Sequence, residues 1–193
     1  MAAIAGTGKP IIRVDDSLKN EMAAQFHREW EGSRMYHRIG NHLYALGYRG
    51  AAKFFWNQAK EEQQHADLVN MVMLKVGIDL YTTEVLPQDV EEEVKLQKGA
   101  IATIGSDFDA VKKVVYFALS YEQQLSSRIE ALYYKAKEAK NFYVSDFLST
   151  LAKEQVEEEE TFATLITKVE KYDGNRTDMY AFDDFLGTFT PSC

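Results

Sequence analysis

The chain has 193 residues, 46% of them hydrophobic and 27% charged, so it can form one domain, or two small ones, with a sizeable core. Thirty acidic and 22 basic side chains give a formal net charge of −8, which disfavours nucleic acids and anionic membranes as partners and favours cations. The single cysteine, Cys193, excludes a disulfide framework or a cysteine-based metal site within one chain. Since neither a signal-peptide pattern nor a membrane span is evident in the sequence, we expect a cytoplasmic protein.

Two long proline-free tracts, residues 11–86 and 88–190, are rich in Ala, Leu, Glu, Lys and Gln, a composition typical of α-helices. In the first tract we predict two helices, over residues 16–46 and 49–76. A capping side chain, Asp16 or Ser17, begins the first helix, and glycines follow the ends of both.

Between the second and third predicted helices lies a segment, residues 77–105, with no sustained helical periodicity. We predict that this segment is a non-helical connection, although it is unusually long for a loop. A third helix should begin at Ser106, with Asp109 completing a start that resembles a capping box, and end near residue 140. A fourth should span about 141–173. A short final helix, 177–186, should carry an apolar face that needs a partner, made of Met179, Phe182 and Leu186.

Four helices of roughly 40–50 Å, with a connection long enough to cross the length of a helix, favour one architecture. We predict an all-α four-helix bundle with one long crossover between the second and third helices and a short C-terminal fifth helix. Residues 1–16 would be an N-terminal extension, 17–172 the bundle, and 173–193 the short helix and tail.

Each long helix places one glutamate inside its apolar stripe, near the middle of the helix: Glu29, Glu62, Glu122 and Glu158. No Lys or Arg lies on these stripes, and burying four unpaired carboxylates would cost more free energy than packing returns. His65 follows Glu62 by three residues, so both side chains point to the same place. A metal ion is the simplest counter-charge. Because oxygen ligands with one imidazole suit iron, we predict an iron site with Glu62 as the bridge between two metals.

These residues resemble the non-haem ferritins of bacterial type over about residues 18–169. The resemblance rests on Glu29 followed seven residues later by Tyr36, on the sequence GAAKFF at 50–55 leading into EEQQH at 61–65, on Glu122, and on EQVEE at 154–158.

The resemblance implies three groups of site residues. The first iron would be bound by Glu29, Glu62 and His65. The second would be bound by Glu62, Glu122 and Glu158, with Gln155 beside it and Tyr36 as a hydrogen-bonding or redox-active neighbour. A third site on the cavity side would consist of Glu61, Glu154, Glu157 and Glu158.

The resemblance also implies a function, which is iron storage with ferroxidase activity. Two Fe(II) ions per subunit would be oxidised by dioxygen and deposited as ferric mineral inside a shell of twenty-four identical subunits. The apolar face of the last helix would serve this assembly. No haem is expected, because Gln63 and Glu158 replace a haem-ligating methionine and a second histidine. Ser145 and Leu148 replace the carboxylates of a three-fold pore, which leaves the route of iron open.

Two other functions remain open from the residues alone. A di-iron or di-manganese oxidase acting on an organic substrate would use the same bundle, although such enzymes usually carry a second Glu-x-x-His. A metal-buffering or structural helical protein would need no oxidation at all. The acidic run 154–160 also suits a solvated helix face. Gly32 and Gly40 indicate places where a neighbouring group approaches the first helix closely.

Overall fold

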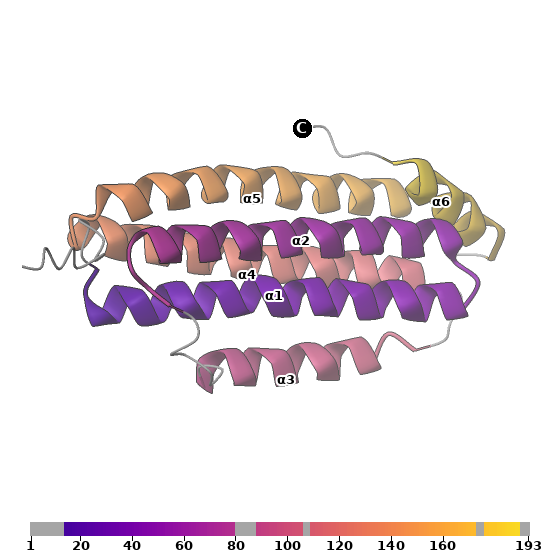
Figure 1. Cartoon of the computed structure of the whole chain (residues 1–193). Coiled ribbons are helices and arrows are strands. Elements are labelled where there is room, and N and C mark those ends of the chain that lie inside the picture. The colour runs from indigo at the N-terminus through magenta and orange to yellow at the C-terminus, as the bar shows by residue number, and fades with distance from the viewer. Residues whose placement is uncertain (1–13, 80–87, 106–108, 173–175, 190–193) are drawn as a thin grey trace, which may run out of the picture.

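The computed structural model describes residues 14–79, 88–105, 109–172 and 176–189. This part of the chain contains six helices and no strand: α1 Asp16–Ala45, α2 Arg49–Lys75, α3 Gln88–Ala102, α4 Ala110–Glu138, α5 Phe142–Val169 and α6 Arg176–Thr188. Helices α1, α2, α4 and α5 form the bundle, α3 lies along the outside of α1, and α6 lies at one end (Figure 1). The predicted four-helix bundle with one crossover and a short C-terminal helix is therefore confirmed. None of the described helices is both long and apolar enough to cross a membrane.

Local capping explains where the long helices begin and end. The Asp15 carboxylate accepts a hydrogen bond of 2.8 Å from the backbone N–H of Leu18, so α1 is capped by Asp15 and not by the predicted Asp16 or Ser17. Gly47 and Gly77, which follow α1 and α2, adopt positive φ angles of 95° and 79° that glycine tolerates best. The Asn141 side chain caps α5 by accepting from Val144 N at 3.1 Å. The predicted capping residue Ser106 lies outside the described residues.

The prediction that residues 77–105 contain no helix was wrong, because α3 occupies much of that segment. Val90 and Val94, one turn apart, are buried against Ala24 of α1. Glu93, on the same helix, accepts from Arg28 Nε at 3.0 Å and lies 2.8 Å from Arg128 Nη2. Ile101 of the same helix packs against the main core, but Gln97 interrupts the stripe of Val90, Val94 and Ile101, so the sequence shows no sustained periodicity. Tertiary contacts stabilise this helix.

A cluster of aromatic rings fills part of the core near the middle of the four-helix bundle. The rings of Tyr36 and Phe162 are stacked with centroids 6.1 Å apart, and Phe55 contacts both of them. All three side chains are fully buried. They form an apolar wall from which water is excluded.

Helix α6 packs on the same chain. Its apolar residues Met179, Phe182 and Leu186 are buried in the single subunit, mainly against α2. Asp183 Oδ1 accepts from Ala51 N at 2.7 Å, which satisfies a free N–H in the first turn of α2. A Cβ at Gly50 would overlap the backbone oxygen of Asp183, so this contact requires glycine. The apolar stripe is therefore not left unpaired for assembly, which corrects that expectation.

Candidate metal centre

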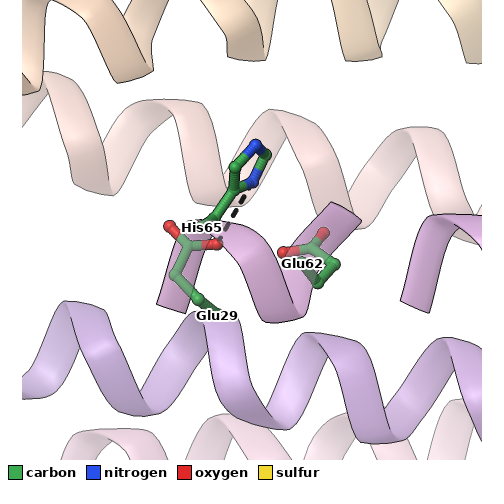
Figure 2. A group of neighbouring side chains, drawn as sticks. All are labelled: Glu29, Glu62 and His65. Atoms are coloured by element: carbon green, nitrogen blue, oxygen red, sulfur yellow. Dashed lines mark ion pairs between the residues drawn. The ribbon is translucent and has the colours of Figure 1, made fainter. Parts of the chain in front are cut away.

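The four stripe glutamates meet in the middle of the bundle. Glu29 comes from α1, Glu62 and His65 come from α2, Glu122 from α4 and Glu158 from α5. One ligand atom each from Glu29, Glu62 and His65 lies within 4.8 Å of the others, and the same is true of Glu62, Glu122 and Glu158. Figure 2 shows Glu29 facing Glu62 and His65 across the interface of α1 and α2. Both groups predicted from the sequence are thus brought together, and Glu62 belongs to both.

Several buried atoms of this cluster have no hydrogen-bond partner. The unpaired atoms are Glu29 Oε2, Glu62 Oε2, His65 Nδ1 and Gln155 Oε1. His65 Nδ1 lies 3.9 Å from Glu29 Oε2 and 3.7 Å from Glu158 Oε1, which is too far for a hydrogen bond. Unsatisfied buried polar atoms are costly, and four at one place need an explanation. A bound cation would satisfy these oxygen and nitrogen lone pairs together.

Burial also perturbs the acidity of the carboxyl groups. It raises the pKa of Glu29 and, together with the nearby carboxylates of Glu122, Glu29 and Glu158, holds the pKa of Glu62 well above its usual value. The pKa of Glu158 is likewise well above its usual value, first because of burial. Burial raises the pKa of Glu122 to about 7, although hydrogen bonds from Tyr36 and Gln155 oppose the shift. Without a bound cation, the carboxyls of this cluster keep their protons to higher pH than exposed carboxyls do, and a divalent cation would displace those protons.

Neighbouring side chains hold the carboxylates in place. Gln155 Nε2 donates to Glu122 Oε2 at 2.7 Å and to Glu158 Oε2 at 3.3 Å, and the Tyr36 hydroxyl donates to Glu122 Oε1. In this arrangement Gln155 positions two carboxylates through its amide nitrogen. The same role belongs to Gln25, whose Nε2 donates to Glu29 Oε1 at 2.6 Å. Sequence reasoning missed Gln25, although its position one turn before a buried glutamate on the same helix was a usable signal.

A second missed residue is Tyr121, whose ring meets that of Tyr36 edge-on at 5.7 Å. Its hydroxyl donates to the backbone oxygen of Arg28 at 3.3 Å. A Cβ at position 32 would overlap this hydroxyl and would lie 3.2 Å from Glu62 Oε2, so the glycine makes room for Tyr121 beside the centre. Gly40 makes room in the same way for Trp56, whose ring atoms would lie 2.5 Å from an added Cβ. The predicted close approaches at both glycines are confirmed.

The residues predicted for a third site are less well assembled. Glu157 is exposed, Glu61 is half-buried and accepts a hydrogen bond from Gln58, and the Glu154 side chain is 44% exposed. Glu154 does approach the centre, since its Oε2 lies 3.7 Å from His65 Nε2. Within the described residues, no group of three ligand atoms within 4.8 Å includes Glu61, Glu154 or Glu157. The third site therefore stays a prediction.

Comparisons with known proteins agree with this geometry. The family profile of the ferritin-like domain matches residues 19–172. The chain is 26% identical over 174 residues to a bacterial non-heme ferritin of Staphylococcus aureus, covering 90% of this chain and 95% of that protein. It is 24% identical to the ferritin BfrB of Mycobacterium tuberculosis, covering 83% of this chain and 80% of that one.

Among solved structures, the fold is similar to that of an open-pore ferritin from the hyperthermophilic archaeon Archaeoglobus fulgidus. The TM-score is 0.74 at 20% sequence identity, over 92% of this chain and 98% of the other. A form of the Archaeoglobus ferritin engineered to be closed gives a TM-score of 0.73. The resemblance first noted in the sequence thus extends to the fold and to most of the length of the chain. The chain belongs to the ferritin family.

Proposed function

We propose that this protein stores iron, and that each subunit oxidises Fe(II) with dioxygen at the buried carboxylate centre. The observation that carries the proposal is the pair of ligand groups that share Glu62, three atoms of which are otherwise unpaired. Iron is the substrate here, bound before oxidation and released afterwards. The ferritin family of the chain, and its relatives named as ferritins, support storage as the purpose of that oxidation.

The proposed roles of the residues follow from their positions. Glu29, Glu62 and His65 would bind one Fe(II), and Glu62, Glu122 and Glu158 would bind the second, with Glu62 common to both groups. Binding displaces the protons that burial keeps on these carboxyls. Each iron loses one electron. The two electrons and two protons convert one dioxygen to hydrogen peroxide, and both irons leave as Fe(III).

The surroundings of the centre assist this reaction. Tyr36 and Gln155 fix the orientation of Glu122, so that the two ligand groups keep their spacing as charge develops. The aromatic wall of Tyr36, Phe55 and Phe162 keeps bulk water away on one side. Glu154 lies beside His65, where a leaving Fe(III) would find a further oxygen ligand.

Storage also requires a container, and we propose a cytoplasmic shell of twenty-four subunits around a ferric mineral. The membership of the chain in the ferritin family supports this assembly. The contacts that build it would not use Met179, Phe182 and Leu186, because α2 of the same chain covers them.

The experiment is to add Fe(II) in air to metal-free protein and to follow dioxygen consumption, particle mass by size-exclusion light scattering, and iron in the eluted particle. We expect one dioxygen consumed for every two irons at low loading, and iron that elutes with a particle of shell size. A small oligomer that retains no iron, or dioxygen uptake no faster than in buffer, would contradict the proposal. The latter result would favour a metal-buffering protein.

A further inference from the structure

A second feature of the molecule lies on the opposite side of the bundle from the acidic residues of α2 and α5. A pocket of about 290 Å³ opens between α3 and α4, over α1, and we call it the α3 pocket. Its apolar wall consists of Leu96, Ala100, Phe117 and Leu125. Helix α3, which the sequence pattern did not reveal, supplies one side of it.

The charges in the α3 pocket disfavour cations. Arg28 and Arg128 both line it, and both pair with the single carboxylate of Glu93. These guanidinium groups make the pocket a less favourable place for Fe(II) than the carboxylates of α2 and α5. Gln97, Ser120 and Gln124 also line the pocket, but most of its lining surface is apolar, which favours a small uncharged molecule.

Tyr121 connects the α3 pocket to the metal centre. Its ring lines the pocket, yet the side chain is buried and its hydroxyl lies over Gly32, close to Glu62 Oε2. Because residue 32 is glycine, no Cβ lies between the Tyr121 hydroxyl and the carboxylate of Glu62. A molecule in the pocket is thus separated from Glu62 by little more than the Tyr121 ring.

We propose that the α3 pocket is the access route by which dioxygen reaches the metal centre, with Tyr121 as the gate between them. The inference rests on the proposed function, since it assigns a path to the oxidant of that reaction. Fe(II) would approach from the acidic side, where Glu154 lies 3.7 Å from His65. The two substrates would then reach the centre from opposite sides, sorted by charge: the cation past carboxylates, and the neutral gas past apolar side chains and arginines.

The test fills the pocket and measures the dependence of oxidation on dioxygen. Ala100→Trp and Leu96→Trp place an indole in the pocket from α3, outside the four-helix core, while Lys98→Trp adds the same group on the exposed face of that helix. Stopped-flow oxidation of two Fe(II) per chain is recorded over a range of dioxygen concentrations. The number of Fe(II) ions bound per chain without oxygen is measured in parallel.

We expect the two pocket variants to raise the KM for dioxygen severalfold while binding the usual number of Fe(II) ions, and Lys98→Trp to behave as the wild type. An unchanged KM for dioxygen in both pocket variants would overturn the inference and leave the proposed function standing. A change in Fe(II) binding without a change in the KM for dioxygen would also overturn the inference. A wild-type protein with no fast oxidation at any dioxygen concentration would overturn the proposed function itself, and the access route with it.

Discussion

Adjacent glutamates on the same helix have very different environments. Glu62 is 2% exposed and carries an unpaired oxygen, whereas Glu61, the preceding residue, is half-buried and hydrogen-bonded to Gln58. On α5, Glu158 belongs to a ligand group while Glu157 faces solvent. One residue is a rotation of about 100° around a helix, which is enough to exchange the core for water.

This difference shows that the helical face, rather than the type of residue, determines which carboxylates can act as ligands. Desolvation raises the pKa of the inward-facing groups, and one oxygen each of Glu29 and Glu62 has no hydrogen-bond partner, so that a cation is the favoured partner. A solvent-exposed glutamate such as Glu157 is already solvated and gains less from the same ion, and the half-buried Glu61 lies between these two cases. We therefore expect substitutions at the buried centre to have large effects and those at the acidic surface to have small ones.

The largest effect should come from Glu62→Ala, because Glu62 is the ligand that both groups share. The initial rate of Fe(II) oxidation, measured by stopped-flow absorbance, should fall by more than about a hundredfold. Glu61→Ala removes the same group one residue away and should keep most of the rate. Similar losses in the two variants would refute the contrast between inner and outer faces.

A second large effect concerns stability against pH in the metal-free protein. The pKa of Glu122 is about 7 in the folded state and near 4.5 when exposed, so the fold prefers the protonated carboxyl. Its stabilising contribution is complete below about pH 4.5 and is lost as the pH rises through about 7, by on the order of 3 kcal/mol. Urea unfolding of metal-free protein should thus show lower stability at about pH 8 than at about pH 5.

The matched control for this pH effect is Glu122→Gln, a neutral side chain of the same shape. The variant should lose much of the pH dependence and be the more stable protein at the higher pH. If wild type and variant show the same pH profile, Glu122 does not carry the protons that burial implies.

A smaller effect is expected from Tyr36→Phe, which removes the hydroxyl that donates to Glu122. Because that hydrogen bond lowers the pKa of Glu122, its loss should raise the pKa and move iron binding to higher pH. We expect the oxidation rate at neutral pH to fall roughly tenfold. Tyr134→Phe alters an exposed tyrosine and should change nothing; a Tyr36 variant that oxidises iron like this control would exclude the positioning role.

The smallest effect on the first turnover should come from Glu154→Ala on the acidic surface. The fast phase should be nearly unchanged, while later turnover or the release of iron is altered, since Glu154 lies beside His65 but outside both ligand groups. Later turnover is measured by multiple-turnover oxidation, and iron release is measured by transfer of iron to a chelator. Glu160→Ala, an exposed glutamate of the same run, is the control. A loss in the first turnover equal to that of Glu62→Ala would contradict the division into sites.

The buried centre could be predicted from the sequence because its signal is local. A glutamate inside an apolar stripe violates the pattern of the helix around it, and four such violations at mid-helix positions indicate a shared site. His65 adds a second ligand within the same turn as Glu62. These features depend only on spacing along single helices, and the four glutamates do meet in the fold.

Other features depend on contacts between distant segments and left weaker signals. Helix α3 is held by Ala24 and by two arginines that lie far from it in the chain. Tyr121 is one of 11 tyrosines, and only its fit over Gly32 distinguishes it from the others. The apolar stripe of α6 was recognised, but its partner was not, because spacing within one helix says nothing about which surface covers it.

The most direct test of the buried centre is a titration of metal-free protein with Fe(II) in air, with the fast oxidation phase followed by stopped-flow absorbance. The two ligand groups that share Glu62 predict that the amplitude of this phase rises linearly and saturates at two irons per chain. Saturation at one iron per chain, or the absence of a fast phase, would contradict the account.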